Sequence, residues 1–248
     1  MESAPNFAQR KTQSPTVQLQ EIDPAAGIWC LDSPLTVLGM PLGHRMTVIR
    51  LSSGDLWVHS PVEWSPPLGE ALSLLGDVRH VVAPSCQHDL YLEEWSARYR
   101  TALFWAAPGL RSQRENVPFS GDLVDQLNPE WAGQIDQCLI GGMPALNEFV
   151  FFHPASRSLL VADLAFNLPS SGDFFSRTLL KMNGCTHGFS PSRAFRWMIK
   201  DRAAFAASLQ HVMVWDFDRI IVSHGDIVER NGKYSMALAF GEFIGLAS

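Results

Sequence analysis

The chain has 248 residues, of which 46% are hydrophobic and 18% are charged, and its formal net charge is −6 at pH 7. A chain of this length and apolar content can bury a sizeable core, so we predict a folded protein rather than an extended one. The negative charge argues against polyanion binding, and we therefore expect no nucleic-acid partner and no membrane partner.

The cysteine spacing and the N-terminus indicate the compartment. The four cysteines are dispersed and contain no Cys-x-x-Cys pair: Cys30, Cys86, Cys138 and Cys185. This spacing favours free thiols in a reducing environment, and the N-terminal residues lack the apolar core of a signal peptide. No apolar run approaches the roughly 18 residues that span a bilayer. We expect a cytoplasmic protein with a disordered tail at residues 1–20 and a single domain at residues 21–248.

The first half of the chain is predicted to open with a β-hairpin and then to alternate helices with strands. The expected elements are strands at 27–32, 45–51 and 56–59, a helix at 66–76, a strand at 78–82, a helix at 90–99 and a strand at 101–107. The small and polar residues 52–55 form the turn of the hairpin. This order of elements is typical of an α/β fold.

The second half is predicted to contain more strands, a long insertion and one strong helix. A polar stretch at 111–129, rich in Pro, Asn and Gly, is expected to be irregular. The other expected elements are strands at 135–140, 148–153 and 158–163, a helical insertion at about 168–196, a helix at 200–215 and a strand at 219–224. The dipeptide Asn231-Gly232 is typical of a β-hairpin turn. The insertion either covers a pocket or contacts a partner chain.

Three of these strands end in side chains that bind metals or transfer protons. His88 and Asp89 follow one strand, Asp163 ends an apolar run, and His224 stands between a buried strand and a glycine. Chemistry in α/β proteins is often placed where strands end. We therefore expect His224, Asp163 and at least one of His88 or Asp89 to lie within one ligand sphere.

Three of these side chains, His88, Asp89 and Asp163, also have a purely structural interpretation. Asp89 is a favoured N-cap for a helix that begins near Leu90, and His88 can cap the same helix. A buried Asp163 can be satisfied by backbone donors instead of a cation. His59, at the end of the hairpin, either binds a metal or hydrogen-bonds to a neighbouring loop.

The remaining histidines are assigned by their positions in the predicted elements. Those interpreted as structural are His44, His80, His153 and His211. His187, within the insertion, is a candidate to reach over a pocket.

The arrangement resembles the metallo-β-lactamase-like fold over nearly the whole chain after residue 25. Four segments fall at the places of that superfamily's motifs: HSP at 59–61, PSCQHD at 84–89, VADLAF at 161–166 and SHG at 223–225. Longer phrases are similar to a family known as domain of unknown function 4336: RMTVIRLSSGDLWVHSPV, WAGQIDQCLI, VFFHPASRSLLVADL and WDFDRIIVSHGDIVERNGK. The resemblance implies an α/β protein with an αββα sandwich.

The resemblance also implies a metal site. Its ligands would be His88, Asp163 and His224, with His59 as a fourth ligand or as a partner of one, and Asp89 would be the water-activating carboxylate.

The same resemblance limits the number of metal ions. Ser85 and Gln87 stand where the superfamily has its first two metal histidines, and neither is a good zinc ligand. No histidine lies between His88 and His153 either. We therefore expect at most one tightly bound transition-metal ion, zinc or iron.

Three functions remain open at this point. The first is a metal-dependent hydrolase of a small ester, thioester, lactone or phosphoester, in which Asp89 accepts a proton from water. The second is a degenerate, non-catalytic member of the fold that binds a ligand or a partner protein. The third is a non-haem iron oxidoreductase. The substrate, the metal and the oligomeric state are not predicted by the sequence.

Overall fold

The structure is a computed structural model, and it describes residues 17–37, 40–168 and 188–245. Its larger sheet has the spatial order β1 (Gln20–Asp23), β2 (Ile28–Ser33), β5 (His44–Arg50), β6 (Leu56–His59), β7 (Val78–Ala83), β8 (Leu103–Ala106) and β9 (Phe119–Asp122). A second sheet has the order β10 (Asp136–Leu139), β11 (Phe149–His153), β12 (Ser158–Val161) and β13 (Arg219–Val222). A short ribbon pairs β3 (Thr36–Val37) with β4 (Met40–Pro41).

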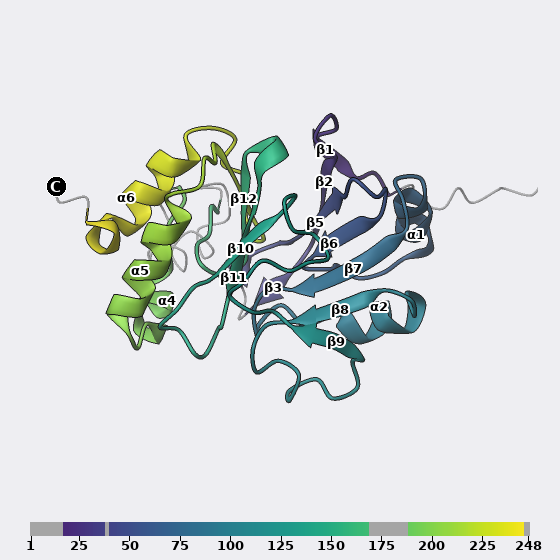
Figure 1. Ribbon diagram of the computed structural model, residues 1–248, viewed down its shortest axis with the longest axis horizontal. Helices are drawn as coiled ribbons and strands as arrows, with labels where there is room; N and C mark the ends of the chain where they lie inside the picture. The colour runs from purple at the N-terminus through teal and green to yellow at the C-terminus, as the bar shows by residue number, and fades with distance from the viewer. Residues whose placement is uncertain (1–16, 38–39, 169–187, 246–248) are drawn as a thin grey trace, which may run out of the picture.

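Helices cover the outer faces of the two sheets. They are α1 (Pro66–Ser73), α2 (Leu92–Arg98), α4 (Arg193–Met198), α5 (Arg202–Val212) and α6 (Gly232–Ile244), with a 3₁₀ turn η1 (Pro154–Ser156) between β11 and β12. Figure 1 shows α1 and α2 on the side of the larger sheet and α4, α5 and α6 on the side of the second sheet. The predicted αββα sandwich is confirmed.

The alternation of side chains along β11 explains how the layers are held together. Phe149 and Phe151 belong to the core between the sheets, together with Trp57 of the larger sheet. Val150 and Phe152 point the other way and join the core beneath α5 and α6. Successive side chains of a strand face opposite sides, so a strand buried on both faces is apolar at every position.

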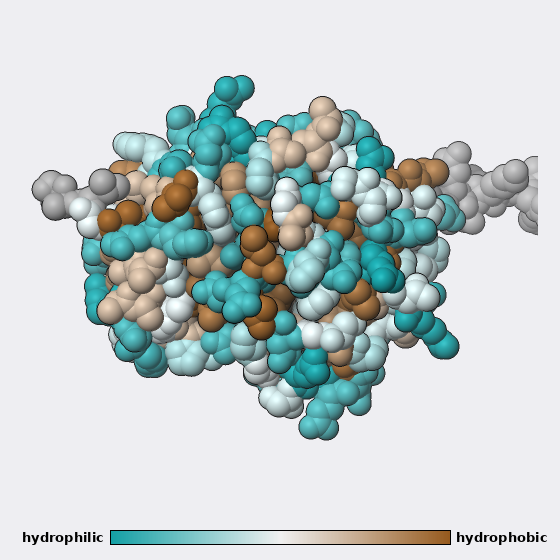
Figure 2. All heavy atoms as spheres, in the orientation of Figure 1, coloured by the Kyte–Doolittle hydropathy of each residue, from teal (hydrophilic) through white to brown (hydrophobic). Residues whose placement is uncertain are grey.

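The outer helices bury one apolar face each. In α1 the buried side chains are Leu68 and Leu72, and in α2 they include Leu92 and Trp95; all four join the core on the outer face of the larger sheet. The opposite faces of α1 and α2 carry exposed polar side chains such as Glu70 and Glu93, whereas α4 and α6 expose Trp197 and Leu238. The side of the molecule seen in Figure 2 is mostly hydrophilic with smaller hydrophobic groups between.

The parallel pairings bring several strand ends to one edge. β6 is parallel to β7, and β12 is parallel to β13. The chain leaves β6 at His59, leaves β7 toward His88, leaves β12 toward Asp163 and leaves β13 toward His224. This shared direction places the predicted site residues at the same edge of the sandwich.

The Asn231-Gly232 dipeptide does not form the predicted hairpin. Asn231 has the left-handed conformation with φ 58°, but it is the N-cap of α6. Its backbone N–H donates to Oδ1 of Asp218 at 2.8 Å. A Cβ atom at Gly232 would lie 2.8 Å from the carbonyl oxygen of Asp218, so the glycine is needed for a close approach rather than for a hairpin.

The predicted irregular stretch 111–129 contains one strand, β9, which the sequence did not reveal. β9 is a half-exposed edge strand with the sequence FSGD, parallel to β8. A short polar strand of this kind has no apolar alternation to detect.

Two predicted segments lie partly outside the described residues. Of the insertion at 168–196, residues 169–187 lie outside, His187 among them, and the described remainder contains α4. Of the tail at 1–20, residues 1–16 lie outside, whereas Leu19 packs in the core and Gln20 begins β1. Within the described ranges, no helix has the length and apolar character needed to cross a membrane.

Candidate metal site

His88, Asp163 and His224 converge at the edge where the parallel strands end. The Nε2 atom of His88 lies 3.4 Å from Oδ1 of Asp163, and Nε2 of His224 lies 3.6 Å from the same oxygen. One donor atom from each residue lies within 4.8 Å of the other two. The predicted convergence is confirmed, while the role of the three residues as metal ligands stays a prediction.

Both imidazoles are oriented through their Nδ1 atoms. In His224, Nδ1 lies 2.6 Å from the carbonyl oxygen of Gly43. A carbonyl only accepts hydrogen bonds, so Nδ1 carries the hydrogen and Nε2 of the neutral ring keeps a lone pair. In His88, Nδ1 lies 2.9 Å from Oγ of Ser60. Metal-binding histidines are commonly held in this way by their second nitrogen.

Asp163 is positioned by two other residues. Its backbone N–H donates to Oε2 of Glu148 at 2.9 Å, and the N–H of Ala162 donates to Oε1 of Glu148 at 2.8 Å. The hydroxyl of Ser85 donates to Oδ2 of Asp163 at 2.8 Å. The backbone donors here bind Glu148, and the side chain of Asp163 accepts from the hydroxyl of Ser85 instead. The structural interpretation, in which backbone donors satisfy the Asp163 carboxylate, is therefore wrong. Oδ1 is left facing the two imidazoles.

The environment keeps Asp163 ionised. Burial alone raises the pKa of a carboxyl group, but the charge that His88 and His224 carry when protonated, together with their hydrogen bonds, holds the pKa of Asp163 well below its usual range. Burial, and then the neighbouring Asp163, raise the pKa of Glu148 well above its usual range. Of the two carboxyl groups, Asp163 rather than Glu148 therefore carries the negative charge, and it does so beside the imidazoles.

The loop that carries His224 is braced by the start of β5. The backbone N–H of Arg45 donates to the carbonyl of Ser223 at 2.8 Å, and its Nη1 donates to the carbonyl of Gly225 at 2.7 Å. Gly225 has φ 98°, and a Cβ atom there would lie 2.2 Å from the carbonyl oxygen of Asn167. Only glycine fits this close approach, which explains the His-Gly sequence after β13.

His59, the predicted fourth ligand or partner of a ligand, is not among the three convergent residues. It is fully buried, with its ring stacked on Trp57 at 5.9 Å and edge-on to Phe151 at 5.7 Å between centroids. Neither ring nitrogen has a hydrogen-bond partner in the part of the chain that the structure describes. The predicted hydrogen bond to a loop is therefore absent there, and the ligand role stays a prediction. Burial first, and then His88 and His44, hold the pKa of His59 well below its usual value.

Asp89 lies beside the site and does not cap a helix. Helix α2 begins at Leu92, with Tyr91 as its N-cap and no side-chain cap, so the capping interpretation of His88 and Asp89 is wrong. Instead Oδ2 of Asp89 accepts a hydrogen bond from Nε of Arg114 at 2.5 Å. The role of Asp89 as a water-activating carboxylate stays a prediction.

A cavity with a volume of about 460 Å³ opens next to these residues. Its wall contains Leu35, Val37, Leu42, His44, Gln87, His88, Asp89, Leu90, Leu146, Asp163, Phe166, Ser192, Phe195, Met198 and His224. A cavity of this size is typical of small-molecule sites.

His44 is part of this wall, although the sequence suggested a structural role. Its ring centroid lies 5.2 Å from that of His88 and 6.0 Å from that of His224, and its Nε2 lies 3.2 Å from the carbonyl oxygens of Ser60 and Pro61. Burial, followed by His88 and His224, lowers the pKa of His44 to about 3, so the ring is neutral. The predicted hairpin could have placed His44 near His59, because antiparallel pairing brings the start of β5 next to the end of β6.

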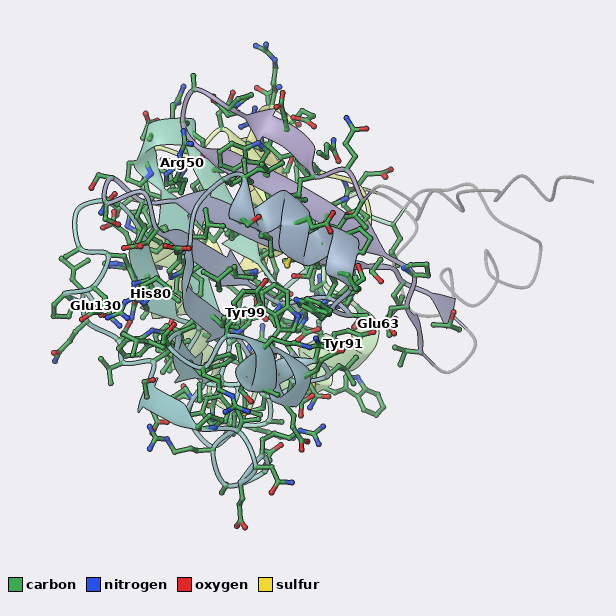
Figure 3. The ribbon with its side chains drawn as sticks, turned by 90° about the vertical axis from the view of Figure 1, so that its right-hand side faces the viewer. Arg50, Glu63, His80, Tyr91, Tyr99 and Glu130 are labelled. Atoms are coloured by element: carbon green, nitrogen blue, oxygen red, sulfur yellow. The ribbon has the colours of Figure 1, made fainter. Side chains whose placement is uncertain are left out.

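Of the other histidines interpreted as structural, His80 and His153 lie in packing positions, whereas His211 is exposed in α5. His80 packs edge-on against Trp131, and its Nε2 lies 4.0 Å from Oε2 of Glu130. Figure 3 shows His80 near Glu130 at one side of the larger sheet and Tyr91, at the start of α2, toward the opposite side. His153 is held by Oγ of Ser156 at 2.8 Å from its Nδ1.

The family model described as Domain of unknown function (DUF4336) matches residues 25–174 of the sequence. The chain belongs to this family. No curated protein matches the sequence. The family assignment agrees with the phrases that the sequence shares with it, several of which lie within the matched residues.

Solved structures establish the fold of this DUF4336 protein. The metallo-β-lactamase DIM-1, exposed to ceftazidime, is similar with a TM-score of 0.61 and 14% identity over 92% of this chain and 98% of that chain. The mono-zinc form of the metallo-β-lactamase FIM-1 from Pseudomonas aeruginosa has a TM-score of 0.59 and 16% identity over 92% and 96%. The flavodiiron protein from Giardia intestinalis has a TM-score of 0.63 and 13% identity over 93% of this chain and 59% of that chain. The fold is therefore metallo-β-lactamase-like.

Proposed function

We propose that the protein binds one transition-metal ion through His88, Asp163 and His224 and is a hydrolase of a small ester, thioester, lactone or phosphoester. The observation that carries the proposal is the orientation of the two imidazoles. Each is held through Nδ1 and presents Nε2 to the same carboxylate oxygen, at 3.4 and 3.6 Å.

The donor set fits a zinc or iron ion. The Nε2 lone pair of His224 and the ionised carboxylate of Asp163 repel each other unless a cation or a proton lies between them, and His88 adds a second lone pair when its Nδ1 donates to Ser60. Imidazole nitrogen and carboxylate oxygen are ligands that both metals accept. Glu148, Ser60 and Gly43 hold these donors in place, as partners of metal ligands commonly do.

When bound at such a site, a metal ion polarises a carbonyl group and lowers the pKa of a coordinated water to about 7. The chain supplies the other functions. Asp89 lines the cavity and accepts the proton of the attacking water at its carboxylate, while Arg114 fixes the orientation of that carboxylate. The neutral His44 forms part of the wall without adding a competing charge.

The proposal is limited to one ion. The hydroxyl of Ser85 is engaged by Asp163, and Gln87 lines the cavity with an amide, which is a weak zinc ligand. Within the described ranges, His88, Asp163 and His224 form the one group of three such side chains close enough to hold an ion. A second ion would need further anionic or imidazole ligands to offset the repulsion between two cations.

A second candidate function is favoured by the same donor count. Two histidines and one carboxylate with open positions also suit non-haem iron, which would make the protein an oxidoreductase. The identity of the bound metal helps to separate the two functions, because zinc has no redox chemistry and would exclude the oxidoreductase.

Metal analysis of the purified protein tests the proposal. We expect one equivalent of zinc or iron in the unchanged protein and in a His211→Ala control, whose histidine lies exposed in α5. The His224→Ala variant should retain almost none. A protein that binds no metal under any loading condition would support the degenerate, ligand-binding function, and two retained equivalents would contradict the single site.

A further inference from the structure

The wall of the cavity is largely apolar next to the proposed ligands. Aside from the histidines and carboxylates, it is built mainly from aliphatic and aromatic side chains: Leu35, Leu42, Leu146, Phe166, Phe195 and Met198. The ring of Phe166 stacks on His224, with centroids 5.4 Å apart and an angle of 26° between the planes. Apolar surface thus begins directly beside one of the proposed ligands.

We propose that this cavity binds the uncharged acyl chain of the substrate, so that the substrates are apolar carboxylic esters or thioesters rather than phosphoesters. This inference rests on the proposed function and narrows its substrate class. The acyl chain would lie against Leu42, Leu146 and Phe166, with the carbonyl group toward Asp163 and the two imidazoles.

The charges of the wall argue against an anionic substrate. Asp89 and Asp163 are acidic, and the described part of the wall includes no lysine or arginine. Arg114 is engaged by Asp89. A phosphate group needs charge-assisted hydrogen bonds to replace its hydration, and here it would face two carboxylates.

The mouth of the cavity continues the apolar wall to the surface. Leu90 is 55% exposed and Val37 is 40% exposed, yet both line the cavity. Exposed apolar side chains at the rim of a cavity are a common feature of ligand-binding grooves. An acyl chain that is too long for the interior would extend to the solvent between Leu90 and Val37.

A homologous series of uncleaved ligands tests the inference. We would measure the binding of N-methylbutanamide, N-methylhexanamide and N-methyloctanamide by calorimetry, with metal-free and metal-loaded protein, and metal content on the same samples. Each added methylene that becomes buried should tighten binding about 4-fold, and each pair of methylenes about 15-fold. In metal-free protein at pH 8, octyl phosphate should bind more weakly than N-methyloctanamide.

Variants link the effect to the cavity. Leu90→Asn should reduce the gain per methylene, because it makes the rim polar, and Leu35→Asn should also reduce it, because Leu35 lines the same cavity. Leu74→Asn is the matched control, since Leu74 is 87% exposed and lies outside the cavity wall. All three variants should keep the metal content of the unchanged protein.

Two results would overturn the inference: affinity that does not depend on chain length, or octyl phosphate that binds more tightly than the amide in metal-free protein. If either occurs with protein that takes up one equivalent of metal when it is loaded, the substrate class is wrong and the proposed metal site stands. If chain-length dependence occurs in protein that cannot be loaded with metal, the hydrolase proposal fails and the cavity's preference for apolar chains stands.

Discussion

Four histidines lie close together at the strand ends, and they form two pairs that differ in how their ring nitrogens are used. His88 and His224 are held through Nδ1 and turn Nε2 toward Asp163. His44 uses Nε2 for backbone carbonyls, and His59 has no hydrogen-bond partner among the described residues. Proximity alone therefore does not select the imidazoles of the proposed metal site. The carboxylate and the partners of Nδ1 are the features that distinguish His88 and His224.

The largest effect on metal binding is expected when the charge of the Asp163 carboxylate is removed. Asp163→Asn replaces an ionised oxygen with a neutral amide of nearly the same shape, so we expect metal binding to be lost while the protein stays folded. Metal content and a thermal unfolding curve measure the two effects. A large fall in melting temperature with unchanged metal content would show that Asp163 is structural.

Glu148→Gln should disturb the position of the Asp163 carboxylate, because Glu148 holds the backbone at Ala162 and Asp163. The amide nitrogen would face a backbone N–H of Ala162 or Asp163 that now donates to Glu148, which should lower the free energy of unfolding by about 1 to 3 kcal/mol. Metal affinity should fall about 10- to 100-fold, because Asp163 loses its support.

Denaturant unfolding and a competitive metal titration measure both effects of Glu148→Gln. Glu242→Gln is the control, since Glu242 forms an exposed ion pair with Arg196, and such pairs contribute about 1 kcal/mol or less. Equal behaviour of the two variants would remove Glu148 from the site.

Two serines allow a matched test of imidazole orientation. Ser60 contacts Nδ1 of His88 at 2.9 Å, and Ser156 contacts Nδ1 of His153 at 2.8 Å, away from the site. Ser60→Ala should weaken metal binding about tenfold, at the lower end of the range for partners of ligands. Ser156→Ala should leave metal affinity unchanged. The dissociation constants come from competition with a chromophoric chelator, and equal constants would contradict the role of Ser60.

The smallest effect is expected at the other pair of histidines. His59→Phe replaces a buried ring without hydrogen bonds by an apolar ring that fits between Trp57 and Phe151. The unfolding free energy should stay within about 1 kcal/mol of its original value or rise, because a desolvated polar group is removed. Metal affinity should change by less than about threefold, as judged by the same chelator competition; a larger loss would make His59 a ligand.

The sandwich and the three convergent residues could be predicted because the signals are local. Apolar runs that end shortly before His88, Asp163 and His224 mark buried strands with functional ends, and the hairpin 45–59 is visible in its alternation and turn. Helix α6 was missed because Asn231-Gly232 is a frequent hairpin turn. The dipeptide itself does not show that the backbone N–H of Asn231 donates to Asp218, which fixes Asn231 as the N-cap of α6.

The supporting residues could not be predicted because their roles depend on contacts that are distant in sequence. The hydrogen bond from His224 to Gly43 joins positions 181 residues apart, and the hydrogen bond from Ser85 to Asp163 joins positions 78 residues apart. Glu148 precedes an apolar strand without any local sign that it binds the backbone after β12. Only the packing of one sheet on the other brings these groups together.

X-ray absorption at the metal edge tests the central claim most directly, because it counts the imidazoles bound to the ion. Protein loaded with one equivalent of zinc should show scattering from two histidine rings, and the His224→Ala variant, if it can be loaded at high zinc concentration, should show one. Three or four imidazoles in the unchanged protein would contradict the account, because His44 or His59 would then bind the ion together with His88 and His224.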